Sequence, residues 1–471
     1  MSQVDVSKFQ RARLIPATDI KGSHDQERRA TSAFLAVLQG VPELTKAILK
    51  EFGVPAGDIQ TFIEPEFKLD TKKVRPDGFI QITRGGKTFR IIVEVKTGKN
   101  ELELTQLNEY LDIAKIEGLD MLLTISNQVL DSTGVHPTKG IDARKLRSTA
   151  LVHLSWMRII SECIILSEHT GVNDADRSWI LKELIRFLQS DASGASEFND
   201  MGTNWVAIRE GVRSGTIRKP DESVVDVVTK FQNLVRYCAL TLAARSGVEA
   251  QEVIPKAAKA DGRKFLLAEA GELLSRKSIK GALKIPGAAS DLEILADIGT
   301  GMTHTSFDLD APSDGKNKSR LNWLLKQWKT VPGDALLSIG YKHSRTMEVP
   351  VKLAQLKSGD SEISMDNSKE IATFRVSIVR SSGDKRGRGK GAFIDSVLSQ
   401  VELTYTELLQ PLKPWVSSAP KLSETVVDLI PKQEKSDSYA DNPDGSEESQ
   451  STAHSSWEGT AEKVETENQQ S

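Results

Sequence analysis

Cysteine and histidine are scarce in this sequence, which has two cysteines, Cys163 and Cys238, and seven scattered histidines in 471 residues. No group of them has the spacing of zinc ligands, which excludes a zinc site of the finger or ribbon type. Both cysteines lie in apolar helical patterns, so we expect buried free thiols in a reducing compartment. The chain also lacks an apolar run of about eighteen residues and an N-terminal apolar segment of the secretory type. We therefore expect a cytoplasmic protein without a membrane span.

The composition, with 38% hydrophobic and 27% charged residues, is typical of a globular protein that can build more than one core. Changes in the hydrophobic pattern indicate five parts. These are an N-terminal arm at 1–20, an α/β domain at 21–200, a helical connecting region at 201–277, an α+β domain at 278–416 and an acidic tail at 417–471. Predicted strands alternate with helical segments in the first domain, so we expect a small mixed sheet flanked by helices.

Charge is unevenly distributed along the chain. The formal net charge is −3, but from Pro431 onward ten acidic residues face three lysines, a charge of −7 that leaves +4 for the rest. The tail is rich in Ser, Glu, Asp, Asn and Gln and poor in apolar residues, which predicts disorder. A mildly basic body suits binding to a phosphate backbone, although this alone proves little.

The stretch at 64–110 is the most informative part of the chain. Residues 78–83 alternate between apolar and polar until two glycines interrupt them, and residues 88–96 are rich in β-branched side chains. This pattern predicts a β-hairpin whose second strand is central in a sheet and covered on both faces.

Charged residues interrupt this apolar hairpin at particular positions. Glu94 and Lys96 are two residues apart, so they project from the same face of the second strand. Asp77 opens the first strand directly after Pro76, and the hairpin should bring it alongside Glu94. Carboxylate and ammonium groups are rare in a central strand unless they are paired or bound to a metal.

This set of residues suits one kind of chemistry. Two carboxylates offer oxygen ligands for Mg²⁺ or Mn²⁺, and such ions keep water positions open for a phosphate and an attacking water. A lysine beside the ion can orient or deprotonate the water and neutralise the charge that builds on phosphorus. Asp77, Glu94 and Lys96 therefore favour metal-dependent phosphodiester hydrolysis.

The arrangement resembles the PD-(D/E)xK nuclease superfamily. Pro76-Asp77 is followed, after sixteen intervening residues, by Glu94-Val95-Lys96. In a predicted helix at 101–115, Gln106 and Tyr110 lie four apart on one face, which looks like the Gln-x-x-x-Tyr signature of the RecB-like branch.

The resemblance implies a restriction-endonuclease-like fold and assigns roles to residues. Asp77 and Glu94 would ligate Mg²⁺ or Mn²⁺ with the Val95 carbonyl as a third ligand, and Gln106 and Tyr110 would face the active site or nearby DNA. Glu27, near the start of a predicted helix, matches an extra acid near the metal in related enzymes, although any helix start favours acids. DNA is the implied substrate, and defence against foreign DNA or DNA repair is suggested by analogy.

Simpler interpretations stay open for each of these features. A Glu-x-Lys pair can be a solvated ion pair, Pro-Asp-Gly can be a turn, and Gln106 with Tyr110 can be a polar helix edge. The whole domain could also be a catalytically inactive nuclease fold that binds nucleic acid or serves in assembly. In a third alternative, the C-terminal α+β domain at 278–416 senses a protein or small ligand, and the nuclease is silent until it is released; otherwise this domain would recognise the target or a partner. The helical region at 205–275 could pack a second domain or mediate a homodimer.

Two basic loops are further candidates for nucleic-acid contact, each weighed against a plain solvated loop. The first, at 127–148, contains Lys139, Arg144 and Lys145. The second is a glycine-spaced loop in the α+β domain, a domain that matches no family; its basic residues are Lys385, Arg386, Arg388 and Lys390.

Overall fold

A computed structural model describes residues 4–15, 23–69, 71–98, 100–128, 136–195, 198–366 and 368–415. The predicted acidic tail at 417–471 and part of the predicted arm at 1–20 lie outside these ranges. Within them, no single helix is long and apolar enough to cross a membrane; α1 and α2 reach that threshold only when counted together across a bend of 107°.

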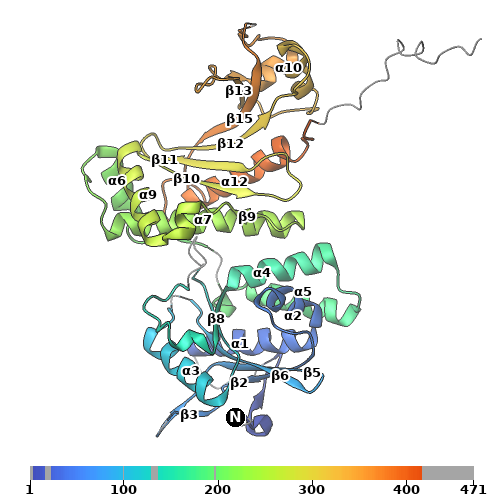
Figure 1. Cartoon of the computed structure of the whole chain (residues 1–471), viewed down its shortest axis with the longest axis vertical. Coiled ribbons are helices and arrows are strands. Elements are labelled where there is room, and N and C mark those ends of the chain that lie inside the picture. Colours follow the sequence, from blue (N-terminus) through green and yellow to red (C-terminus); the bar gives the residue numbers. More distant parts are fainter. Residues whose placement is uncertain are drawn as a thin grey trace, which may run out of the picture. The chain divides into compact units, whose positions relative to one another are not determined.

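A six-stranded sheet forms the centre of the N-terminal part of the chain (Figure 1). Its spatial order is β1-β2-β5-β6-β7-β8. The strands are β1 (Gln10–Arg11), β2 (Asp58–Ile63), β5 (Gly78–Arg84), β6 (Lys87–Val95), β7 (Met121–Ser126) and β8 (Ala150–Ser155). Pairing is antiparallel from β1 to β6 and parallel from β6 to β8. The predicted hairpin is therefore β5–β6, and its second strand is interior to the sheet.

Helices cover both faces of this sheet. The helices are α1 (Ser23–Gly40), α2 (Pro42–Leu49), α3 (Leu104–Glu117), α4 (Trp156–Ile165) and α5 (Ala175–Leu188). On β6, Ile91, Val93 and Val95 join the core under α1, α2, α4 and α5, whereas Ile92 joins the core under α3. This alternation follows from the two-residue period of a strand. The prediction of an α/β fold with a mixed sheet flanked by helices is confirmed at this level.

A small hairpin precedes the sheet's central strands in the sequence. Strands β3 (Phe67–Leu69) and β4 (Lys72–Val74) pair only with each other. Phe67 and Val74 are buried and belong to the core under α3. The hairpin therefore packs on the same side of the sheet as α3.

The remainder of the described chain builds a second, all-antiparallel sheet with helices. Its order is β14-β13-β15-β12-β11-β10-β9. The strands are β9 (Gln251–Glu252), β10 (Ser278–Lys284), β11 (Leu292–Asp297), β12 (Met302–Asp310), β13 (Ala335–Tyr341), β14 (Val351–Lys352) and β15 (Ile371–Ser381). The helices are α6 (Trp205–Ser214), α7 (Glu222–Ser246), α8 (Lys256–Ala260), α9 (Gly262–Arg276), α10 (Asn317–Leu325), α11 (Leu353–Ser358) and α12 (Phe393–Leu403).

Helix α7 is the longest of these helices, and its ends follow local rules. The side chain of Asp221 accepts hydrogen bonds from the backbone amides of Ser223 and Val224, and Gly247 ends the helix in a left-handed conformation with φ 72°. Its apolar side chains share one hydrophobic cluster with the second sheet. Residues on both sides of the predicted boundary at 277 therefore contribute to the same core.

The ends of helices α4 and α10 are fixed by local contacts. Ser155 ends β8 and caps α4, where its side chain accepts the backbone amide of Arg158. Helix α4 stops at Ile165 and continues as a π-helical turn, Leu166–Thr170, that closes at Gly171. Helix α10 ends at Leu325. Beyond it, the indole of Trp328 donates to the carbonyl of Leu408, which places this side chain in the core.

Candidate functional site

Strand pairing places Asp77 beside the end of β6. Gly78, the first residue of β5, is opposite Val93, so Asp77 lies at the level of Glu94. The Oδ2 atom of Asp77 accepts the backbone amide of Val95 at 2.7 Å. This hydrogen bond holds the carboxylate of one strand against the next strand, as the hairpin prediction required.

Lys96 lies just beyond β6 and pairs with two acids. Its Nζ is 2.6 Å from Oε1 of Glu94 and 3.5 Å from Oε1 of Glu27, which comes from α1. The backbone amide of Lys96 donates to the carbonyl of Ile125 at 2.8 Å, so the residue is held at the end of the parallel β6–β7 pair. Glu94 is 1% exposed and Glu27 6%. Residues far apart in sequence thus form one buried ionic cluster.

Helix α3 adds the two residues of the Gln-x-x-x-Tyr pattern. The Nε2 atom of Gln106 donates to the hydroxyl of Tyr110 at 2.8 Å. Tyr110 is buried, and burial raises the pKa of its phenol, with further contributions from the charges of Glu94 and Asp77. These two side chains therefore extend the cluster along α3 rather than forming a solvent-exposed helix edge.

The electrostatics of the cluster are dominated by its burial. Burial, and then repulsion from Glu94 and Glu27, hold the pKa of Asp77 well above its usual range. Burial likewise raises the pKa of Glu94, although Lys96 opposes this. For Lys96, burial alone would lower the pKa, but the neighbouring acids outweigh it and raise the pKa. The cluster has three acids and one ammonium group, so its carboxylates outnumber the cations that could neutralise them, and a bound cation would favour their ionised forms.

Unpartnered carboxylate oxygens support the same conclusion. Oε2 of Glu27 and Oε2 of Glu94 are buried and have no hydrogen-bond partner among the described residues. Such oxygens are costly unless something satisfies them. In the described ranges, no group of three His, Cys, Asp or Glu side chains forms a metal-ligand cluster. Mg²⁺, however, commonly uses only one or two carboxylates and keeps several waters, so Asp77 and Glu94 fit this ion.

A row of polar side chains continues from Glu94 across the sheet. Thr124 on β7 is paired with Glu94 in register, and His153 on β8 is paired with Thr124. The Thr124 hydroxyl is 2.8 Å from Nε2 of His136 and 3.0 Å from Nδ1 of His153. The sequence analysis did not single out Thr124, His136 or His153, because their alignment with Glu94 depends on the register of parallel strands.

The hydrogen bonds determine the tautomers of both histidines. Nδ1 of His136 accepts the amide of Thr138, so its Nε2 donates to Thr124. Nε2 of His153 lies 2.9 Å from the carbonyl of Gln128 and must donate, so Nδ1 carries no proton and can only accept. The single proton of the Thr124 hydroxyl is shared between this Nδ1 at 3.0 Å and the carbonyl of Val152 at 3.1 Å. Burial lowers the pKa of each histidine to about 4. Both rings are therefore neutral at pH 7.

The first predicted basic loop is partly tied down on α3. Nζ of Lys145 is 2.6 Å from a carboxylate oxygen of Asp112, and Arg144 pairs with Asp142 at 3.2 Å. Lys139 is exposed. The loop thus offers Lys139 to solvent, whereas Lys145 anchors the loop.

The second predicted basic loop folds onto the C-terminal core. Arg388 pairs with Asp395 at 2.7 Å and donates to the hydroxyl of Tyr237, and Arg386 approaches Asp200 at 3.5 Å. These partners do not belong to the cluster around Glu94. Lys385 donates to the carbonyl of Lys390 at 3.0 Å, which closes the loop on itself.

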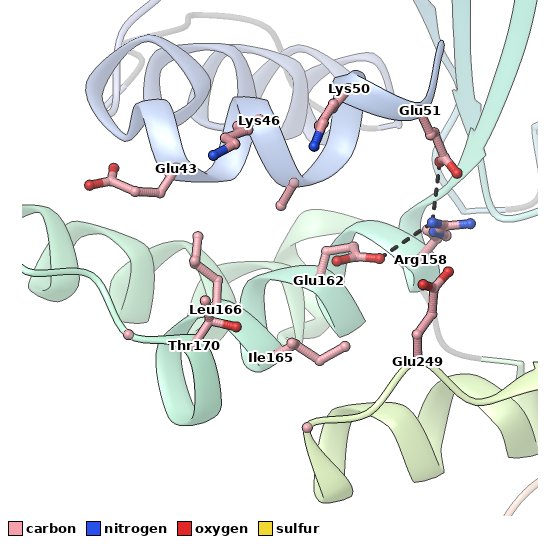
Figure 2. Close-up of a pocket in the computed structure, with 13 residues that line it drawn as sticks. Glu43, Lys46, Lys50, Glu51, Arg158, Glu162, Ile165, Leu166, Thr170 and Glu249 are labelled. Atoms are coloured by element: carbon pink, nitrogen blue, oxygen red, sulfur yellow. Dashed lines mark ion pairs between the residues drawn. The ribbon is translucent and has the colours of Figure 1, made fainter. Parts of the chain in front are cut away.

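A cleft of about 700 Å³ lies elsewhere, and none of the cluster residues lines it (Figure 2). Figure 2 shows Lys46 and Lys50 of the α2 segment above α4, with Arg158 at one end. Arg158 pairs with Glu51 at 3.2 Å and with Glu162 at 3.4 Å. The cleft is lined by both acidic and basic side chains, so it presents no surface of a single sign.

Comparison with protein-family models found no match, and comparisons with curated proteins and with solved structures found none either. The resemblance to PD-(D/E)xK nucleases therefore depends on the motif residues of the sequence. The geometry of the site brings together Asp77, Glu94, Lys96, Gln106 and Tyr110, with Glu27 in contact through Lys96.

Proposed function

We propose that the N-terminal α/β part of this chain is a metal-dependent nuclease that hydrolyses phosphodiester bonds, with DNA as its substrate. The observation that carries the proposal is the buried contact of Glu94 with Lys96 beside Asp77, at the end of two adjacent strands. In this cluster Oε2 of Glu27 and Oε2 of Glu94 are buried without a hydrogen-bond partner among the described residues, which leaves both oxygens open to a further ligand.

Each residue has a role that follows from its surroundings. Asp77 and Glu94 would hold Mg²⁺ or Mn²⁺, with the carbonyl of Val95 as a further oxygen. The bound ion would lower the pKa of a water and offset the negative charge of the phosphate. Lys96, with its pKa raised by the acids, carries a positive charge that orients the water and stabilises the charge on phosphorus.

Two side chains of helix α3 orient the carboxylate of Glu94. Gln106 positions the Tyr110 hydroxyl, and Tyr110 faces Glu94. A side chain that contacts a metal-binding carboxylate in this way keeps the carboxylate in one orientation and so preserves its affinity for the metal. Glu27, which shares Lys96 with Glu94, keeps the ammonium group close to the reacting phosphate.

Cleavage of linear and circular plasmid DNA in Mg²⁺ or Mn²⁺ tests the proposal. Wild type should cut, and Lys96→Met and Glu94→Gln should each reduce cutting by at least about 100-fold. A matched control is Lys46→Met, which removes an exposed lysine from the cleft of Figure 2. Equal cutting by wild type and both active-site variants would refute the assignment, as would a wild type that binds no metal and cuts no DNA.

A further inference from the structure

The β3–β4 hairpin carries a cationic face that the proposed chemistry does not use. In its antiparallel register, Lys68 is directly opposite Lys73. Their neighbours Phe67 and Val74 point into the core under α3, so the two lysines project to the other side, into solvent. Two positive charges therefore stand side by side on the outer face of the hairpin.

This face is only partly neutralised. Lys73 pairs with Glu66 at 2.8 Å, and both side chains are more than half exposed, so water weakens the pair. Lys68 and Arg75 are exposed and have no ion pair among the described residues. Like charges opposite one another destabilise a strand pair, and a bound polyanion would relieve that repulsion.

The hairpin is held next to the proposed active site. Arg75 precedes Asp77 by two residues, and the amide of Glu64, before the hairpin, donates to the carbonyl of Asp77 at 3.1 Å. On the inner side, Lys72 pairs at 2.7 Å with Glu109, the neighbour of Tyr110 on α3. The cationic face is thus anchored at both the strand and the helix that build the acidic cluster.

We infer that the outer face of the β3–β4 hairpin, formed by Lys68, Lys73 and Arg75, binds the sugar–phosphate backbone of the nucleic acid that enters the Asp77–Glu94 site. Lysine and arginine contacts to phosphates supply affinity and position without reading sequence. The acidic cluster itself repels a polyanion, so a cationic surface beside it is needed to hold the substrate. The inference rests on the proposed function for the identity of the ligand.

The β5–β6 turn provides a matched control. Arg84 and Lys87 are exposed, and they too lie directly opposite each other in an antiparallel pair. They are at the far end of the same strand from Asp77, about 20 Å away at roughly 3.3 Å per residue. Removing two charges from either place changes the net charge equally, so only location distinguishes the two variants.

The experiment measures binding of the full chain to a fluorescent DNA duplex in EDTA, where no cutting occurs, over a range of salt concentrations. Lys68→Ser/Lys73→Ser should raise Kd at least about 10-fold and reduce the slope of log K against log salt by about two. Arg84→Ser/Lys87→Ser should leave both within about 2-fold of wild type. Thermal unfolding of each variant checks that the fold is retained.

Other outcomes have defined meanings. Equal losses in both double variants, no loss in either, or no binding by wild type would overturn the inference. A different outcome is that the wild type binds DNA through the hairpin but does not cut it in Mg²⁺ or Mn²⁺. This result would refute the proposed nuclease activity and leave the hairpin as a nucleic-acid-binding surface. The two proposals therefore fail separately.

Discussion

The carboxylate of Asp77 accepts the backbone amide of Val95 at 2.7 Å, so an acid on one strand is fixed by the main chain of the next. An asparagine can accept the same hydrogen bond without bringing a negative charge. The substitution Asp77→Asn therefore removes the charge of this side chain while it keeps the position of the side chain.

We expect Asp77→Asn to abolish cutting while raising stability. Because burial and the neighbouring acids raise the pKa of Asp77, the folded state binds its proton more tightly than the unfolded state. Stability of the metal-free protein should therefore fall as pH rises from about 4. At pH 7 the Asn variant should be more stable by about 1 kcal/mol in urea unfolding, with a flatter pH dependence. Lower stability of the variant would contradict this account.

The contact between Lys96 and Glu94 should show strong coupling. Lys96→Met leaves the buried Glu94 carboxylate without its cation and should cost about 3 kcal/mol of unfolding free energy. Adding Glu94→Gln should recover much of that loss, because the uncompensated charge is then removed. A double-mutant cycle from urea denaturation measures the coupling, and simple additivity of the two changes would show that the pair is not energetically linked.

Tyr110→Phe removes a hydroxyl that accepts from Gln106 and faces Glu94. Stability should fall by about 1 kcal/mol, and cutting should fall about 10-fold while DNA binding in EDTA is unchanged. Tyr405→Phe, in the C-terminal core, is the matched control and should cut as wild type does. Full activity of Tyr110→Phe would remove the helix α3 pair from the proposed site.

The two neutral histidines should make the protein acid-sensitive. Because burial lowers the pKa of His153 from 6.5 to about 4, the unfolded state takes up a proton first as pH falls. Stability is thus lost between about pH 6.5 and pH 4, by roughly 2 to 4 kcal/mol for this residue. His153→Gln should flatten this part of the stability–pH curve, and His136→Gln should do so by a further increment. An unchanged slope in the double variant would place the acid sensitivity elsewhere.

Much of the candidate site could be predicted because strand periodicity is a local property. Glu94 and Lys96 are two residues apart, which predicts that they project from the same face of a strand. The turn at Gly85–Gly86 predicts a hairpin, and the hairpin brings Asp77 alongside Glu94. The polar row through Thr124 and His153 could not be found in this way. It depends on the register of parallel strands joined through helices, which no turn specifies.

By itself, the sequence determined the hairpin, the alternation of apolar and charged positions on β6 and the helical spacing of Gln106 and Tyr110, because each depends on neighbours a few residues away. Only the tertiary structure decided that Glu27 shares Lys96 with Glu94, that Arg388 and Lys145 are held by local acids, and that Lys68 and Lys73 stand opposite each other on the outer face of a hairpin. Burial and pairing between distant segments set these relationships, and they arise only when the sheet and its covering helices pack together.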